Sequence, residues 1–246
     1  MNDAFEDESV CGADGCSTGP ARLLPNNREP RQVHELTVVS DVICPWCFIA
    51  KRNLDRALES TRGDLVVKIT WRPFELNPGM PKEGMDRRDY RSQKFGSWEY
   101  SQGLDMQVAA AGELAGIAFR HDLMKRTPNT FNAHRLIWLA EEERVQDALV
   151  EALFRAYFIE GRDVGDRREL ADIARQVDLS QGLVVPFLEG TNGTKEVRAQ
   201  EDNAKMSGIS SVPTFILNGV KLFSGALKPE QMAARLQDAV RVRAEG

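Results

Sequence analysis

The chain has 246 residues, of which 42% are hydrophobic and 28% are charged, and its formal net charge is −5. These values are typical of a folded, water-soluble protein with one elaborated domain or two small ones. The negative, interspersed charge argues against nucleic acids and anionic membranes as partners. No apolar run approaches the ~20 residues that span a bilayer. The first ten residues lack the basic and apolar regions of a secretory signal, so we expect a cytoplasmic protein.

Residues 1–33 are rich in glycine, proline, asparagine, serine and charged side chains, and they show no hydrophobic periodicity. We interpret them as a mobile tail. The tail carries Cys11 and Cys16, which are separated by four residues, two of them glycine. One hypothesis is that these cysteines form an auxiliary redox pair. Other interpretations are that they supply half of a four-cysteine zinc site, or that they have no role.

Residues 34–41 have the alternating, β-branched character of a buried strand. The sequence Cys-Pro-Trp-Cys follows at 44–47, and residues 45–60 have the periodicity of a helix with proline in its first turn, where it is tolerated. The strand therefore delivers Cys44 to a helix N-terminus, where unpaired N–H groups and the helix dipole stabilise a thiolate. We expect Cys44 to be the exposed, reactive thiol and Cys47 to be packed inside. A C-x-x-C pair in this position is more often a redox centre than a structural element.

Residues 65–72 alternate apolar and polar side chains, which predicts a second strand with one buried face. The helix between the two strands implies that they pair in parallel. Residues 80–206 then have an almost wholly helical pattern. Within them, residues 166–169 form a capping-box-like helix start. We interpret the apolar stretch 133–159 as two helices that are separated near residues 143–146.

Strand character returns at residues 212–217. Asn218 and Gly219 form the dipeptide that most strongly predicts a hairpin. Residues 220–223 return as a strand, and a last helix begins near Pro229.

The predicted order is strand–helix–strand, then a helical insertion, then strand–strand–helix. This order describes an α/β thioredoxin fold with a large helical domain inserted between its two halves. We assign residues 34–79 and 207–246 to the thioredoxin-fold domain. Residues 80–206 form the inserted helical domain in this interpretation.

Five ordered motifs carry a resemblance that extends over residues 34–245. The chain resembles the DsbA-like thioredoxin-fold proteins, and within that group it is most similar to the cytoplasmic FrnE-like oxidoreductases. These proteins are relatives of 2-hydroxychromene-2-carboxylate isomerases and kappa-class glutathione transferases. The motifs are Asp41-Val-Ile-Cys-Pro-Trp-Cys47, Trp71-Arg-Pro-Phe-Glu-Leu-Asn-Pro78, Asn129-Thr-Phe-Asn-Ala-His-Arg-Leu136, Ala156-Tyr-Phe-Ile-Glu-Gly161 and Val212-Pro-Thr-Phe215.

The resemblance implies dithiol–disulfide chemistry with Cys44 as nucleophile and Cys47 as resolving thiol. It also implies a cis peptide bond at Pro213, which faces the cysteines and turns the backbone of Val212 toward the substrate chain. The isomerases of the group typically have serine at the first cysteine position and use glutathione, so the presence of both cysteines favours the oxidoreductase branch. Ser211 departs from the pattern, because glycine is common at that position.

The resulting hypothesis is a protein disulfide oxidoreductase that exchanges with protein or small thiol and disulfide substrates and is recycled by a cellular thiol reductant. We expect no resident cofactor and no metal, with glutathione as a candidate reductant. Trp46 offers no imidazolium to stabilise a neighbouring thiolate, so we expect a reducing couple that works in the reductase or isomerase direction. Three alternatives stay open. They are a glutathione-dependent isomerase or transferase for a small aromatic substrate, a four-cysteine zinc-binding protein, and a redox-regulated chaperone.

Further residues are candidates for supporting roles. Pro45 and Trp46 belong to the active-site loop, as does Asp41, which lies three positions before the motif. Asp41 is suited to ordering this loop, to moving a proton or to capping the helix. His134 lies near a predicted helix start in the insertion and is a candidate cleft residue, with a hydrogen-bonded structural role as the alternative. The sequence offers little support for Glu75, a titratable residue after the second strand.

Overall fold

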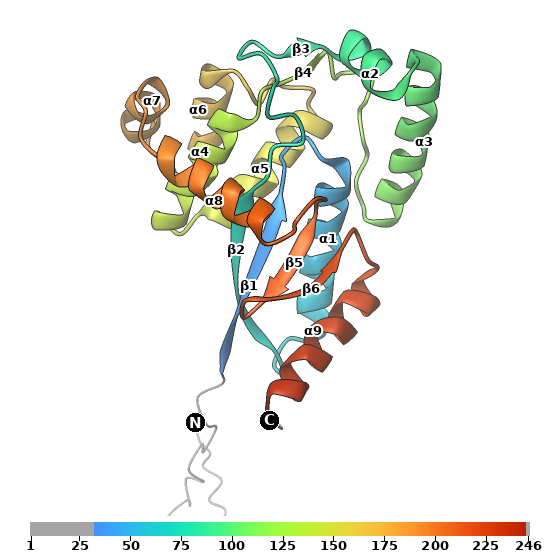
Figure 1. The fold of residues 1–246 in the computed structure, drawn as a ribbon, viewed down its shortest axis with the longest axis vertical. Coiled ribbons are helices and arrows are strands. Elements are labelled where there is room, and N and C mark those ends of the chain that lie inside the picture. Colours follow the sequence, from blue (N-terminus) through green and yellow to red (C-terminus); the bar gives the residue numbers. More distant parts are fainter. Residues whose placement is uncertain (1–31, 245–246) are drawn as a thin grey trace, which may run out of the picture. The chain divides into compact units, whose positions relative to one another are not determined.

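A four-stranded sheet forms the centre of the computed structural model, which describes residues 32–244. Its strands run in the order β2-β1-β5-β6 (Figure 1). They are β1 (Val33–Ser40), β2 (Val66–Pro73), β5 (Thr214–Leu217) and β6 (Val220–Ser224). The predicted parallel pairing of β1 with β2 is confirmed, whereas β5 is antiparallel to both of its neighbours. Segments from both ends of the described chain therefore share one sheet.

Nine helices accompany the sheet within residues 32–244. They are α1 (Pro45–Ser60), α2 (Arg87–Phe95), α3 (Trp98–Leu114), α4 (Phe131–Glu142), α5 (Gln146–Phe158), α6 (Arg167–Arg175), α7 (Gln181–Glu189), α8 (Thr194–Met206) and α9 (Pro229–Ala244). Helices α2 to α8 lie between β2 and β5 in the sequence, so the fold is an α/β thioredoxin fold with an inserted helical segment. None of these helices is long and apolar enough to cross a membrane.

The insertion also contains a pair of two-residue strands that the sequence did not predict. They are β3 (Met85–Asp86) and β4 (Arg126–Thr127), which pair antiparallel. A strand of two residues is too short to produce an alternating pattern, so hydrophobic periodicity cannot reveal it.

Helices cover both faces of the sheet. Successive side chains of a strand point to opposite faces. Val38 accordingly belongs to the main hydrophobic core, together with residues of α1 and α9. Its neighbour Val39 lies in a smaller cluster on the other face, with Ala204 of α8 and Ile209. The sheet is thus enclosed by the cysteine-bearing helix on one side and by the end of the insertion on the other.

The sheet and the helical insertion share the main core. Phe48 of α1 stacks on Phe154 of α5, with ring centroids 5.2 Å apart, and Phe158 lies 6.1 Å away. Lys51 is only 4% exposed at the same contact, and its Nζ atom lies 3.1 Å from a carboxylate oxygen of Asp147. These contacts hold the insertion against the helix that starts at the cysteines.

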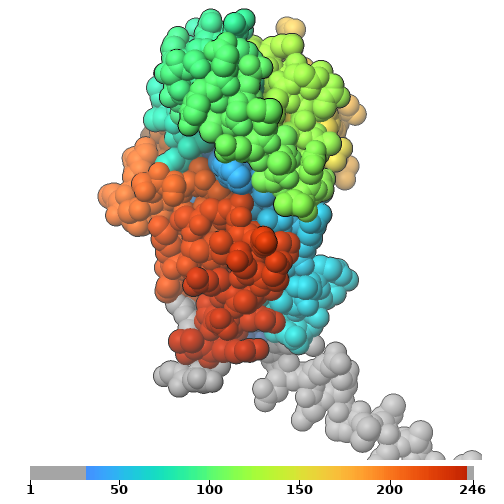
Figure 2. All heavy atoms as spheres, turned by 90° about the vertical axis from the view of Figure 1, so that its right-hand side faces the viewer, coloured from blue at the N-terminus to red at the C-terminus, as the bar shows by residue number. Residues whose placement is uncertain are grey.

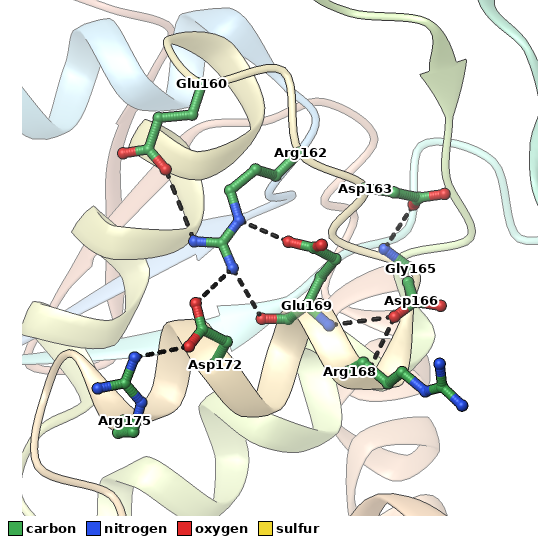
Figure 3. A network of polar contacts seen from close by, with 9 residues as sticks. All are labelled: Glu160, Arg162, Asp163, Gly165, Asp166, Arg168, Glu169, Asp172 and Arg175. Carbon is green, nitrogen blue, oxygen red and sulfur yellow. Dashed lines mark hydrogen bonds and ion pairs between the residues drawn. The ribbon is translucent and has the colours of Figure 1, made fainter.

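The start of α6 is where the sequence placed a helix cap. Asp166 accepts hydrogen bonds from the backbone N–H groups of Arg168 and Glu169, at 2.8 and 3.1 Å. Figure 3 shows the guanidinium of Arg162, in the loop before this helix, among the carboxylates of Glu160 in the same loop and of Glu169 and Asp172 on α6. The cap and the ion pairs together fix the loop between α5 and α6.

Two further local predictions are confirmed. The apolar stretch divides into α4 and α5 between Glu142 and Gln146. Asn218 and Gly219 both have positive φ angles, of 49° and 81°, between β5 and β6. This is the backbone geometry that a two-residue hairpin of type I′ requires.

Candidate active site

Cys44 and Cys47 lie at the start of α1, and both thiols are free. Cys44 is the N-cap residue, with extended backbone angles (φ −89°, ψ 111°), and the N–H group of Cys47 donates to its carbonyl oxygen over 3.0 Å. The proline of the motif occupies the first turn of the helix. The sequence therefore places both cysteines correctly in the secondary structure.

Cys44 is buried, which corrects the expectation of an exposed thiol. Only 4% of Cys44 and none of Cys47 is exposed. The cause is the segment before β5: the Cys44 thiol lies 3.7 Å from the carbonyl oxygen of Val212, to which it donates. A residue 168 positions away in the sequence thus covers the nucleophile that local patterns suggested would be open.

The peptide bond between Val212 and Pro213 is cis, the geometry that the family resemblance implies. Thr214 of β5 pairs with Val39 of β1, and this register brings the two preceding residues beside the active-site loop. The Thr214 hydroxyl also donates to the carbonyl oxygen of Ser211 over 2.8 Å. Strand pairing and this hydrogen bond together position the cis segment against the cysteines.

Burial raises the pKa of the Cys47 thiol well above its usual value, and the neighbouring Cys44 side chain raises it further. The Ser40 hydroxyl and the Asp41 backbone act in the opposite direction. Cys47 therefore retains its proton when charge develops on Cys44. The two thiols are chemically distinct, as a nucleophile and a resolving group must be.

Trp46 is the most accessible part of the motif, with 42% of its surface exposed. In the space-filling view, the blue atoms from the segment around β1 and the start of α1 appear as a small patch between the green part of the helical insertion and the orange-red C-terminal part (Figure 2). The active-site loop is thus framed by two separate regions of the chain.

Asp41 is fully buried and connects three segments. One carboxylate oxygen accepts a hydrogen bond from the backbone N–H of Leu76, over 2.7 Å, and the other lies 3.3 Å from Nε2 of His134. The interpretation of Asp41 as a helix cap is wrong, because no side chain caps α1. Asp41 instead links the loop before Cys44 to the loop after β2 and to α4.

His134 projects from α4 into this site and is almost completely buried. Burial lowers the pKa of its imidazole, but the carboxylates of Asp41, Glu201 and Glu75 outweigh that effect and raise the pKa above its usual value. The candidate cleft residue is therefore a buried titratable group beside the active-site loop.

Sequence reasoning missed most of the acidic cluster behind His134. Glu75 and Glu201 are both buried, and Arg198 pairs with each of them. Burial and the nearby Glu201 raise the pKa of Glu75, whereas Arg198 and His134 oppose that rise. The spacing of Arg198 and Glu201 on α8 suggests an ion pair. Nothing local indicates that Glu75 joins it from a distance of 123 residues.

No group of three or more metal-binding side chains is present among the residues that the structure describes. Cys11 and Cys16 lie outside those residues. The auxiliary redox pair and the four-cysteine zinc site therefore stay predictions.

The sequence model of the DSBA-like thioredoxin domain matches residues 35–237, so the chain belongs to this family of thiol–disulfide oxidoreductases. A probable DsbA oxidoreductase from Streptomyces coelicolor is 31% identical, with a TM-score of 0.75 and coverage of 84% of this chain and 89% of that one. YwbO from Bacillus subtilis is 26% identical over 80% of this chain and 96% of its own length. The cytosolic disulfide reductase DsbM from Pseudomonas aeruginosa, solved with GSH, shares the fold at 19% identity, with a TM-score of 0.60 and coverage of 84% and 99%.

Proposed function

We propose that the protein is a FrnE-like cytoplasmic enzyme that exchanges its Cys44–Cys47 dithiol with disulfides in protein substrates, in the reductase or isomerase direction. The observation that carries this proposal is the asymmetry of the thiol pair. Cys44 lies at a helix start under the Val212 carbonyl group, and Cys47 lies one turn inward with a raised pKa.

The exchange proceeds in two displacements at sulfur. The Cys44 thiolate attacks a substrate disulfide, one substrate sulfur leaves as a thiolate and takes a proton from water, and the other stays bonded to Cys44. Cys47 then loses its proton and attacks the Cys44 sulfur, which expels the second substrate thiolate. Two electrons have moved from the protein dithiol to the substrate. A cellular thiol reverses the sequence and restores the dithiol.

The identity of the residue between the proline and Cys47 supports the reducing direction. Trp46 carries no positive charge that would stabilise a thiolate, and a less stabilised thiolate makes the disulfide form more stable. The cytosolic glutathione pool is poised at roughly −220 to −320 mV, so it can supply electrons to a couple of this kind. Glutathione is the candidate reductant, and the structure of the related fold of DsbM, which was solved with GSH, supports that choice.

Equilibration with glutathione and dithiothreitol buffers tests the direction. We expect a reduction potential well below the value of roughly −120 mV of the strongly oxidising DsbA, near roughly −200 to −270 mV. The same sample should reduce insulin disulfides at the expense of dithiothreitol. Cys44→Ser should abolish this activity, and Cys47→Ser should accumulate mixed disulfides. A potential close to that of DsbA, or full insulin reduction by the Cys44→Ser variant, would contradict the proposal.

The alternatives are tested on the same preparation. Zinc retained by the reduced protein would support the four-cysteine site. Conjugation of glutathione to an aromatic electrophile, at a rate that exceeds insulin reduction, would support the transferase alternative.

A further inference from the structure

A small cavity lies between the sheet and α4, on the inner side of the active-site loop. Ser40 of β1, Trp71 and Arg72 of β2 and His134 of α4 are among the residues that line it. Its volume of about 10 Å³ is close to the smallest space that holds one water molecule. The cavity is therefore of a size for a single water and too small for a larger ligand.

Two polar atoms of the cavity lining have no aligned hydrogen-bond partner in the described part of the chain. They are Oγ of Ser40 and Nε2 of His134, and both are buried. His134 Nε2 lies 3.3 Å from Asp41, but the contact lacks the alignment of a hydrogen bond. Buried polar atoms are rarely left without a partner, and a bound water commonly supplies one. A water in this cavity would satisfy both atoms at once.

Ser40 connects this cavity to the resolving thiol. Ser40 lies directly before the turn in which the Asp41 carbonyl oxygen accepts from the N–H of Cys44, at the start of the helix that carries Cys47. The Ser40 hydroxyl opposes the rise in the pKa of Cys47 that burial causes. Cys47 is completely buried, so solvent cannot remove its proton directly. The attack of Cys47 on a mixed disulfide therefore requires an internal route for that proton.

We propose that Ser40, one water molecule in this cavity and His134 form a proton relay. By this path the proton of Cys47 leaves when that thiol attacks Cys44. The inference rests on the exchange reaction proposed above and assigns a new role within it. The path ends on the imidazole of His134, with Asp41 beside it.

The transfer balances as follows. The Cys47 thiol gives its proton to Oγ of Ser40, Ser40 passes its own proton to the water, and the water passes one to Nε2 of His134. The Cys47 sulfur uses the freed electron pair to bond to Cys44, and the bond between Cys44 and the substrate sulfur breaks. The substrate leaves as a thiolate, and His134 holds the proton as imidazolium until solvent removes it.

The charged groups around His134 come from two loops and one helix, and most of them are carboxylates. Asp41 follows β1, Glu75 follows β2, and Glu201 lies on α8; Arg198 of α8 pairs with the two glutamates.

Arg72 of β2 also lines the cavity, and its charge is paired with Glu141 of α4. The carboxylates stabilise the imidazolium and raise the pKa of His134. His134 must be neutral to accept a proton, so the resolution step should slow as the pH falls through that raised pKa.

Stopped-flow reaction with Ellman's reagent separates the two thiols. All proteins carry Cys11→Ser and Cys16→Ser, so that Cys44 and Cys47 are the only thiols. Cys44 releases the first chromophore at a rate that depends on reagent concentration. Cys47 releases the second by attack on the mixed disulfide, at a rate that does not. The pH dependence of the second phase reports the resolution step.

In His134→Gln we expect the second phase at neutral pH to slow by roughly 10²-fold, the usual size of a lost proton-transfer group. In the parent, the rate of the second phase should fall as the pH drops through the raised pKa of His134, which lies above 6.5. This fall should be absent in His134→Gln, and the first phase should be unchanged. Ser40→Ala should slow the second phase likewise, and it provides an independent test if the histidine variant does not fold. His34→Gln is the matched control. Like His134, His34 is a buried histidine, but it lies on β1 and contacts Asn218. In this variant both phases should match those of the parent.

The result distinguishes the relay from the proposed function. If the parent protein shows both phases and each variant keeps the parental second-phase rate and pH profile, the relay is wrong while the exchange chemistry stands. Equal slowing of both phases would likewise contradict the relay, because a general distortion of the site affects Cys44 as well. Loss of the second phase in the parent itself would instead contradict the exchange reaction.

Discussion

A buried histidine is ordinarily neutral, because moving an imidazolium out of water is unfavourable. At His134 burial lowers the pKa, but the neighbouring carboxylates outweigh it and raise the pKa above its usual value, with Asp41 3.3 Å away and two glutamates behind it. The site therefore keeps a proton-binding group of raised affinity in contact with the loop that carries the cysteines. His134 thus connects the active-site loop, through Asp41, with the charged side chains of α8.

We expect the free energy of unfolding to fall as the pH rises through the raised pKa of His134. The folded state binds this proton more tightly than the unfolded state, whose pKa is about 6.5. The stabilisation is thus fully present below that value and is lost as the pH rises through the folded-state pKa. Each unit of pKa difference contributes about 1.4 kcal/mol. Urea unfolding at several pH values should show this dependence in the wild type and its loss in His134→Gln. The same pH dependence in both proteins would show that folding does not raise the pKa of His134.

At the residue scale, the sequence reveals what is local. The cysteines are found from four consecutive positions. The pairing of Asp41 with His134 joins residues 93 positions apart, because 134 − 41 = 93. The burial of Cys44 depends on Val212. Neither contact leaves a pattern in any short window of sequence, so both required the fold.

At the scale of elements, the contact between α1 and α5 combines a stack of aromatic rings with a nearly buried lysine. Lys51 lies 3.0 Å from a carboxylate oxygen of Asp55 and 3.1 Å from one of Asp147, with Glu151 4.0 Å away. These carboxylates raise its pKa although burial lowers it. The lysine therefore stays charged and offsets three negative groups at the junction of sheet and insertion.

Lys51→Met should destabilise the fold by about 1–3 kcal/mol at neutral pH, since it leaves the three carboxylates without their shared cation. The loss should shrink in acid, where protonated carboxyl groups no longer repel one another. Urea unfolding at both pH values measures it. The control is Arg62→Met: Arg62 pairs with Glu59 at an exposed position, and the change should cost less than about 1 kcal/mol. A loss as small as that of the control would contradict the role of Lys51.

The boundaries of helices and strands were predictable from the sequence where a residue with restricted or unusual backbone angles, such as proline or glycine, stands at the boundary. The first helix was expected at 45–60 and is found at Pro45–Ser60, because proline and the preceding extended residue define its start. The Asn218-Gly219 turn is equally explicit. The pair β3 and β4 has no such marker, since its four residues are held by tertiary contacts and not by their own pattern.

At the scale of the molecule, residues 32–244 form one compact unit with one main core. That core includes side chains from the sheet, from α1 and from the inserted helices. Topology separates the insertion from the thioredoxin fold, but packing does not.

We therefore expect this part of the chain to unfold in a single cooperative transition. Its tryptophans report on both regions: Trp46 and Trp71 lie near the sheet, and Trp98 and Trp138 lie in the inserted helices. Unfolding curves from tryptophan fluorescence and far-ultraviolet circular dichroism should coincide. Two resolved transitions would show that the insertion is stable by itself.

The cover over Cys44 has a consequence for the choice of substrate. A thiol that is only 4% exposed and lies 3.7 Å from the carbonyl oxygen of Val212 admits only a narrow approach. We expect a disulfide in a rigid, folded domain to reach such a thiol slowly. A disulfide in a flexible, extended polypeptide can approach the Cys44 thiol more easily. For the proposed exchange reaction, we therefore expect the buried thiol to select disulfides by the conformational freedom of the chain around them, so that unfolded polypeptides react faster than folded proteins.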